Sequence, residues 1–150
     1  MARSSPVARI PPRRKREPLT RSQMMARIRS KNTRPEVLTR SAVQALGQRF
    51  RNHVDNLPGK PDLANKTRKW AIFVHGCFWH SHPRCRLASS PKSNIGYWGK
   101  KLGQNHARDV RKIAALKSQG YRVLVVWECD TRDGVRMTNA LEEFFSMTTD

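Results

Sequence analysis

The chain has 150 residues, a length typical of one domain, and we expect no second folded domain beside it. Thirty Lys and Arg against 11 Asp and Glu give a formal net charge of +19. This charge favours nucleic acid as the partner over an anionic membrane surface, because no helix with a basic face stands out. The sequence has no run of 18 apolar residues and no apolar leader, so we expect a cytoplasmic protein without a membrane span.

Residues 1–20 form a basic segment with four prolines, the run Arg13 to Arg16 and few large apolar side chains. A chain of this composition cannot bury enough apolar surface to fold, so we expect a disordered arm. Two interpretations of the arm remain: a solubilising tail, or a contribution to non-specific DNA affinity. The folded domain is then expected over residues 21–150.

The elements expected in the domain are a helix, several strands, a helix, a strand and a last helix. Thr33, Pro35 and Glu36 are typical of a capped helix start, and Gly47 of the helix end. Residues 121–127 (YRVLVVW) are the most apolar stretch and predict a central strand. Further strands are expected at 49–52, from Asp62, and at 70–74, and further helices at 93–118 and 135–145. The order predicts a mixed α/β domain in which helices cover one sheet.

The loop at 75–91 contains the first chemical signal. Cys77 and His82 are separated by four residues, His82 and Cys85 by two, and Cys129 follows a predicted strand far downstream. Three thiolates and one imidazole make a closed zinc site, which would order a loop with little apolar content. His80 is the alternative imidazole, and we favour His82. The competing interpretation is three unrelated reduced thiols and a surface histidine.

Carboxylates are scarce and give the second signal. Asp62 begins a predicted strand, and His75 ends the buried strand that follows it. Strands that meet there would bring a carboxylate, a main-chain carbonyl and an imidazole around one hard cation such as magnesium. The competing interpretation of Asp62 is an aspartate that only starts a strand, and Glu36 could serve the helix cap alone.

Two neighbouring aromatic side chains give the third signal. Phe78 and Trp79 lie between the thiol Cys77 and two histidines, in a loop where a core position is hard to assign. In a basic protein such side chains could wedge between base pairs of DNA. The alternative is a small satellite core beneath the loop.

Five stretches of the sequence share the pattern of a known family. They are TRSQMMARIRSKNTRPE (20–36), LPGKPDL (57–63), IFVHGCFWHSHPRC (72–85), YWGKKLGQNHARD (97–109) and GYRVLVVWEC (120–129). In these stretches the chain resembles the very short patch repair (Vsr) DNA mismatch endonucleases. The resemblance covers nearly the whole expected domain.

This resemblance implies a restriction-endonuclease-like PD-(D/E)XK fold, in which helices flank a mixed central sheet and a structural zinc holds a loop. The implied activity is a magnesium-dependent nick 5′ of the thymine in a T·G mismatch that arises from 5-methylcytosine deamination, which initiates very short patch repair. The implied protein is a monomer in the bacterial cytoplasm, associated with the nucleoid. It would act on double-stranded DNA, with mismatch-repair machinery and a DNA cytosine methyltransferase as functional partners.

The resemblance also implies roles for single residues around the magnesium ion. Asp62 would be the metal-binding carboxylate, Val74 would contribute its main-chain carbonyl, and Glu36 would reach the metal through water. Residues 73–75 replace the ExK half of the fold's usual motif, and Val74 stands where many members have Thr.

Three groups of implied roles complete the site. His80 would handle the proton at the attacking water or the leaving oxygen, Asp109 would orient it, and His75 would lie against the hydrated metal and the phosphate. The implied zinc ligands are Cys77, His82, Cys85 and Cys129, with one residue more between His82 and Cys85 than in the family's HxC. The implied wedge that enters the base stack is Met25, Phe78 and Trp79.

Two other functions remain open at this stage. The first is a restriction-type nuclease of the same fold that acts on matched sites. The second is a non-catalytic, zinc-containing DNA-binding module in which Asp62 and His80 are only structural.

Overall fold

The computed structural model describes residues 18, 20, 31–89 and 91–147. The expected arm at 1–20 lies outside these residues apart from Pro18 and Thr20, and so does Met25. Lys31–Asp150 forms one compact unit. Among the described residues, no helix has the length and apolar character needed to cross a bilayer.

A four-stranded mixed sheet forms the centre of this unit. Its order is β1 (Arg51–Asn52), β2 (Leu63–Asn65), β3 (Trp70–His75) and β4 (Arg122–Trp127). The first three strands pair antiparallel, whereas β3 and β4 pair parallel over six residues. The prediction that the 121–127 stretch forms a central strand is therefore wrong, because β4 is an edge strand of the described sheet. Its apolar character comes from helices on both of its faces and does not require a strand on each side.

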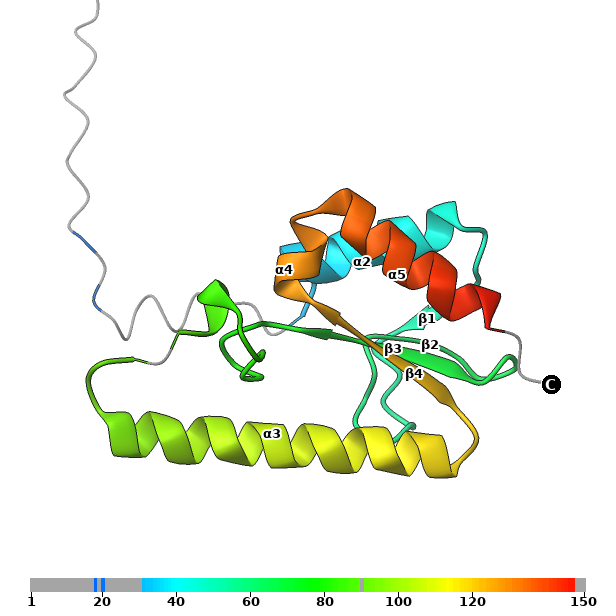
Figure 1. Cartoon of the computed structure of the whole chain (residues 1–150). Coiled ribbons are helices and arrows are strands. Elements are labelled where there is room, and N and C mark those ends of the chain that lie inside the picture. Colours follow the sequence, from blue (N-terminus) through cyan, green and yellow to red (C-terminus); the bar gives the residue numbers. More distant parts are fainter. Residues whose placement is uncertain (1–17, 19, 21–30, 90, 148–150) are drawn as a thin grey trace, which may run out of the picture. The chain divides into compact units, whose positions relative to one another are not determined.

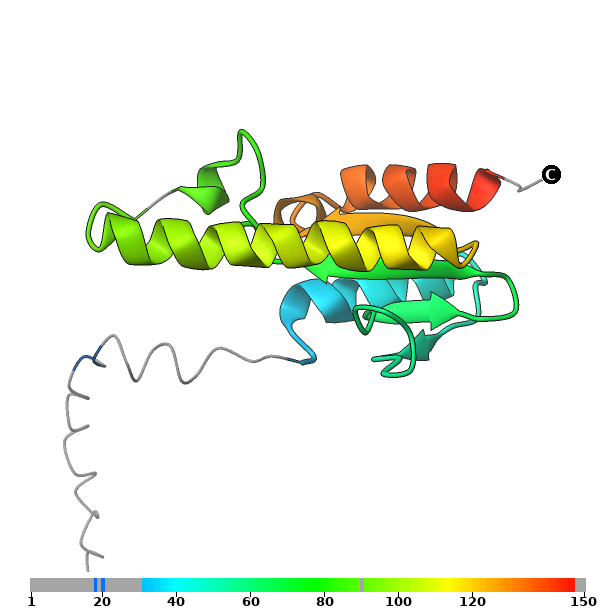
Figure 2. The same ribbon diagram turned by 90° about the horizontal axis from the view of Figure 1, so that it is seen from below.

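Helices cover both faces of the sheet and make a three-layer α/β/α arrangement (Figures 1 and 2). One face carries α2 (Arg34–Ala45), α4 (Glu128–Thr131) and α5 (Gly134–Ser146), and the other carries the 24-residue α3 (Ile95–Ser118). A single 3₁₀ turn, η1, spans Arg86–Ala88. The expected helices match α2, α3 and α5 closely, whereas the short α4 was not predicted from the sequence.

Alternation along β3 divides the core into two halves. Trp70 and Ile72 pack toward α2 and α5, and Ala71 and Phe73 pack toward α3. All four side chains are at most 5% exposed. A strand that is buried on both faces reads as a continuous apolar run, which is the pattern predicted for residues 70–74.

Two hydrogen bonds that involve Glu36 cap the start of α2. Thr33 Oγ1 accepts a hydrogen bond from Glu36 N at 3.4 Å. Glu36 Oε2 accepts from Asn32 N at 2.8 Å, one residue before the partner that a capping box predicts. The Glu36 carboxylate is thus held near the helix start by its own backbone.

The loop before β2 is fixed against α3 by a glycine. Gly59 has φ +74°, and a Cβ at this position would lie 2.6 Å from Lys112 Cβ. Only glycine combines this backbone conformation with so close an approach to the helix. The following Pro61 is fully buried, so the chain reaches Asp62 along a rigid path.

The inner face of α3 connects three parts of the molecule. Trp98, Asp109 and Leu116 are its buried residues. Their spacings of 11 and 7 residues correspond to about three and two helical turns, so the three side chains share one face. Leu116 belongs to the core, whereas Trp98 and Asp109 lie at the site described next.

Candidate active site and metal-ligand clusters

Asp62 is attached to the neighbouring strand by its side chain. Its Oδ2 accepts a hydrogen bond from Val74 N at 2.7 Å, across the β2–β3 pair. This bond brings the carboxylate beside the peptide of Val74, near the end of β3. The structure therefore brings together Asp62 and Val74, two residues that the sequence analysis grouped.

Burial dominates the electrostatics of Asp62. It raises the pKa of this carboxyl from 3.8 to about 6, and the nearby Glu36 acts in the same direction. The hydrogen bond from Val74 and the positive charges of His53 and His80 oppose the rise. Burial makes the anionic form of this carboxyl unfavourable, and a bound cation would offset that cost.

Glu36, His53 and Asp62 form a cluster of ligand-type side chains. One ligand atom from each lies within 4.8 Å of those of the other two. The three come from the start of α2, the end of the β1 segment and the residue before β2. Glu36 is 6% exposed, so its carboxylate faces the cluster rather than solvent.

His75, His80 and Asp109 form a second cluster. The His75 and His80 rings stack at 3.8 Å between centroids with an angle of 5° between planes. His80 Nδ1 and Asp109 Oδ2 are 2.5 Å apart, a short hydrogen bond that fixes the orientation of the ring. His80 thus has the geometry of an oriented proton carrier.

The two histidines differ in their surroundings. Burial lowers the pKa of His75 from 6.5 to about 4, and the positive charges of His80 and Lys112 add to this effect against the opposing Asp109. His75 is therefore a neutral imidazole at pH 7. The two rings also differ in their contacts. His80 is hydrogen-bonded to Asp109, whereas His75 stacks on His80 and packs edge-on against Trp127.

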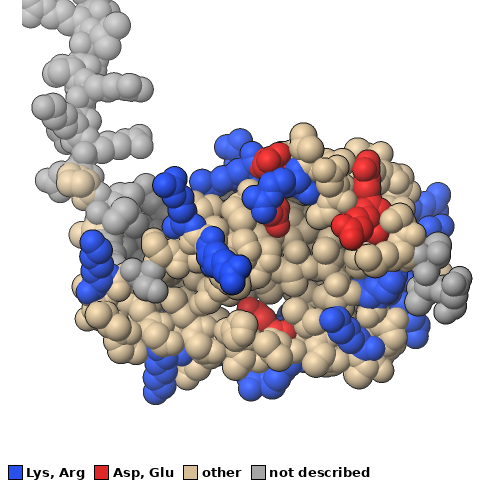
Figure 3. Space-filling view, in the orientation of Figure 1, with Lys and Arg blue, Asp and Glu red and all other residues tan. Residues whose placement is uncertain are grey.

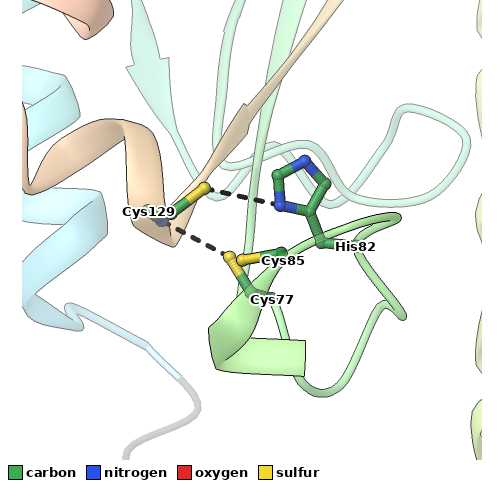
Figure 4. Close-up of side chains that lie close together, drawn as sticks. All are labelled: Cys77, His82, Cys85 and Cys129. Atoms are coloured by element: carbon green, nitrogen blue, oxygen red, sulfur yellow. Dashed lines mark hydrogen bonds between the residues drawn. The ribbon is translucent and has the colours of Figure 1, made fainter. Parts of the chain in front are cut away.

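Cys77, His82, Cys85 and Cys129 lie close together just beyond the ends of β3 and β4 (Figure 4). Their ligand atoms all lie within 4.8 Å of one another. Cys129 Sγ and His82 Nδ1 are 3.4 Å apart, and Cys129 N donates to Cys77 Sγ at 3.4 Å. All three thiols are free, so the cluster is no disulfide. His82, and not His80, is the imidazole that joins it.

The chemistry of the cluster suits a soft cation. Burial, as the largest cause, raises the pKa of the Cys77 thiol to about 12, so it stays protonated at neutral pH without a bound cation. Three sulfur donors and one imidazole nitrogen are a closed tetrahedral set for zinc. Trp127 stacks on His82 at 4.1 Å and contacts His75 edge-on at 5.4 Å, so one indole lies against both clusters.

Phe78 and Trp79 are half-buried, and their support comes from α3. Trp98 lies 5.4 Å from Phe78 and 5.8 Å from Trp79 between ring centroids. Asn105 Nδ2 donates to Trp79 O at 3.1 Å, which ties the loop to the same helix. The two predictions for Phe78 and Trp79, a satellite core beneath the loop and a wedge, are therefore compatible. Trp98 packs against both rings, and both keep part of their surface in solvent.

The surface around these groups is basic. Figure 3 shows Lys and Arg side chains spread over the visible face, whereas the acidic side chains gather in few places. A surface of this kind attracts a polyanion over a long range. The Glu36 and Asp62 carboxylates and the His80–Asp109 pair therefore lie in a protein whose charge suits phosphate backbones.

Sequence reasoning and structure agree on most of the grouping, but two residues were missed. The structure brings together the carboxylate, histidine and cysteine groups that were predicted. Of the predicted wedge, Met25 lies outside the described residues. His53 was missed because it stands alone in the sequence, and only the hairpin brings it to Asp62. Trp98 was missed although its 11-residue spacing from Asp109 places both on one helix face.

A pair of neighbouring carboxylates, a His–Asp pair and a Cys/His cluster on a basic α/β unit are the features expected of a nuclease. Residues 14–86 match the family described as DNA mismatch endonuclease Vsr. Over 120 residues the chain is 39% identical to the DNA mismatch endonuclease Vsr of Escherichia coli K12, covering 80% of this chain and 76% of that protein.

Two relatives carry a different name. The type II nicking enzyme V.XorIIP of Xanthomonas oryzae is 50% identical over 116 residues, which cover 77% of this chain and 85% of that protein. The type II nicking enzyme V.NmeAIP of Neisseria meningitidis is 40% identical over 113 residues, or 75% and 80% of the two chains. The chain belongs to the Vsr family of DNA mismatch endonucleases.

Proposed function

We propose that this endonuclease nicks one strand of duplex DNA on the 5′ side of the thymine in a T·G mismatch. Such a mismatch is left when 5-methylcytosine deaminates, and the nick would initiate very short patch repair. The observation that carries this proposal is the juxtaposition of Asp62 with the His75, His80 and Asp109 cluster, in a chain of the Vsr family.

Asp62, Glu36 and the main-chain carbonyl of Val74 are the groups that would hold magnesium. The fit is supported by the destabilised Asp62 carboxylate and by an all-oxygen set from these three residues. Bound there, magnesium would stabilise the extra negative charge of the pentacovalent phosphate. Glu36, held by Asn32 N, would act on the ion through water rather than by direct contact.

His80 is the residue we assign to proton transfer. Its Nδ1 is engaged by Asp109, so the opposite nitrogen would exchange a proton with the attacking water or the leaving 3′ oxygen. His75, neutral at pH 7, would hold the phosphate side of the site without adding charge. Asp109 would be a positioning residue that acts through His80.

Phe78 and Trp79 would form the wedge that enters the base stack, together with Met25. Intercalation unstacks a base step at a cost of a few kcal/mol, and a mismatched step costs less than a paired one. The support of both rings by Trp98 would keep them in position for insertion. Selectivity would thus rest in part on the deformability of the mismatch.

The Cys77, His82, Cys85 and Cys129 cluster would hold a structural zinc and order the loop that carries the wedge. A T·G site is asymmetric, and one nick needs one active site, so the protein would act as a monomer. In the cell it would act at the bacterial nucleoid. It would serve the sites of a DNA cytosine methyltransferase, alongside mismatch-repair machinery.

The test is a nicking assay on labelled duplexes that differ in one pair, T·G against C·G, placed in several candidate methylation sites. We expect a single magnesium-dependent cut 5′ of the mispaired thymine. The cut should disappear with EDTA and in Asp62→Ala. Binding should weaken with salt, with a log-log slope of about −0.9 for each phosphate neutralised.

A second candidate function has specific support, because two relatives are named type II nicking enzymes. A restriction-type nuclease of the same fold would cut the matched duplex as well as the T·G duplex. Equal cleavage of both duplexes would replace our proposal with this one. Tight binding without any cut, unchanged in Asp62→Ala, would instead indicate a non-catalytic DNA-binding module.

A further inference from the structure

His53 is the one imidazole near the carboxylates that the proposed function leaves without a role. It follows β1 and has φ 46°, a left-handed conformation that a non-glycine residue adopts only at a cost. Its backbone N donates to Asp62 O at 3.0 Å, so His53 and Asp62 oppose each other across the hairpin. The hairpin thus directs a histidine and an aspartate to one place.

The distances around His53 are those of ligands that share an ion. His53 Nε2 and Glu36 Oε2 are 3.8 Å apart, too far for a hydrogen bond. Two ligands at about 2.1 Å from one ion are about 3 Å apart when adjacent and about 4 Å when opposite. The ligand atoms of Glu36, His53 and Asp62 all lie within 4.8 Å of one another, so small side-chain movements bring them around one cation.

His53 also faces the outside of the molecule. Its side chain is 24% exposed, against 8% for Glu36, and it lines a cleft of about 750 Å³ beside β1 and β2. The imidazole therefore lies between the carboxylates and the solvent.

We propose that His53 is a direct ligand of the cation that Asp62 would bind directly and that Glu36 would reach through water, which makes this a mixed nitrogen and oxygen site. Magnesium prefers oxygen donors alone, whereas first-row transition ions accept imidazole nitrogen readily. The site should then bind Mn²⁺ in preference to Mg²⁺ by more than an all-oxygen site does. This inference rests on the proposed function in one respect, the assignment of the metal to Asp62.

The competing role for His53 is purely electrostatic, as a partner that positions the Glu36 carboxylate. The two roles differ in their metal dependence. A ligand contributes according to the ion's affinity for nitrogen, so its loss changes the selectivity between ions. A positioning residue acts on the carboxylate, so its loss weakens every divalent ion by a similar factor.

The experiment measures Mn²⁺ binding to the full-length, zinc-loaded protein by electron paramagnetic resonance, with Mg²⁺ affinity obtained by competition. His53→Gln replaces the imidazole nitrogen with an amide oxygen, and His106→Gln is the matched control because His106 is exposed on α3. We expect His53→Gln to weaken Mn²⁺ binding by about tenfold or more and Mg²⁺ binding by less than threefold. His106→Gln should change neither.

A spectroscopic readout tests the ligand itself. Pulsed resonance on bound Mn²⁺ should show ¹⁴N coupling in the wild type and in His80→Gln, and no such coupling in His53→Gln. Equal weakening of both ions, or ¹⁴N coupling that survives His53→Gln, would overturn the proposal. If His53→Gln does not fold by circular dichroism, His53→Asn replaces it in the same comparison.

Asp62→Ala separates this inference from the proposed function. It should abolish binding of both ions at the site. If Asp62→Ala leaves both affinities unchanged, the assignment of the metal to Asp62 fails and the proposal about His53 fails with it. If Asp62→Ala abolishes binding while His53→Gln leaves selectivity unchanged, only the His53 proposal fails.

Discussion

The cysteine cluster and the carboxylate cluster are both suited to a cation, but they are built in opposite ways. Cys77, His82 and Cys85 come from one loop, and only Cys129 is added from α4, directly after β4. Glu36, His53 and Asp62 come from a helix start and two sides of a hairpin. The first is a closed soft set that suits zinc, and the second an open, oxygen-rich set.

This difference assigns separate tasks to the two clusters. A closed site saturates its ion with protein ligands, so its binding energy goes into folding. An open site leaves positions for water and phosphate, so its ion is available for chemistry. Removal of the first ion should therefore act on stability, and removal of the second on cleavage.

The largest expected effect comes from the cysteine cluster. Cys129→Ser removes one of four ligands, and we expect loss of zinc, a decrease of several kcal/mol in the free energy of unfolding and a Tm lower by at least about 10 °C. Zinc content by mass spectrometry and thermal unfolding measure both effects. The exposed Ser81→Ala is the control in the same loop. An unchanged Tm in zinc-free Cys129→Ser would show that the cluster is not a structural site.

The carboxylate cluster should give the opposite result. Asp62→Ala should reduce the nicking rate by about a thousandfold or more, because it removes several kcal/mol of transition-state stabilisation. DNA affinity, measured by fluorescence anisotropy, should change by less than about threefold. The distinction between the clusters is lost if this variant also unfolds in the presence of zinc.

Asp62→Asn sharpens the comparison through pH. The folded-state pKa of about 6 lies above the ordinary 3.8, so ionised Asp62 destabilises the magnesium-free fold at pH 7. The favourable contribution of Asp62 is complete below pH 3.8 and is lost as pH rises through 6. We expect Asp62→Asn to be more stable than the wild type by up to about 3 kcal/mol at pH 7 and by little at pH 4.

Urea unfolding of zinc-loaded, magnesium-free protein at several pH values measures this difference. The comparison between variant and wild type also removes the contribution of His75, which titrates in the same range in both proteins. A stability difference that does not depend on pH would mean that Asp62 is not held as a destabilised anion.

The smallest expected effect comes from Asp109, the residue proposed to position His80. Asp109→Asn keeps a hydrogen-bonding group near His80 Nδ1 but removes the negative charge, and we expect a rate loss of about 10- to 100-fold. DNA affinity and Tm should change little, since Asp109 contacts His80 and acts through it. Asp55→Asn, an exposed aspartate in the loop that follows β1, is the control. A loss of rate accompanied by a matching decrease in Tm would indicate a structural role for Asp109.

The parts of the site that depend on local spacing could be predicted from the sequence, and the parts that depend on tertiary placement could not. The ligand set Cys77, His82 and Cys85 follows from spacing, and Asp62 from its position before a strand. His53 joins the site only because the hairpin brings it opposite Asp62. The edge position of β4 was missed for a related reason, since burial by helices on two faces and burial between two strands leave the same apolar pattern.

The hydrogen bond from Val74 N to Asp62 bears on which substitutions position 74 can accept. The donor is a main-chain N–H, which every residue except proline supplies. Any residue except proline at position 74 would therefore keep the contact that holds the aspartate. The side chain of Val74 packs against the core, so apolar replacements should be tolerated best, whereas a change to proline would break the link between the two strands.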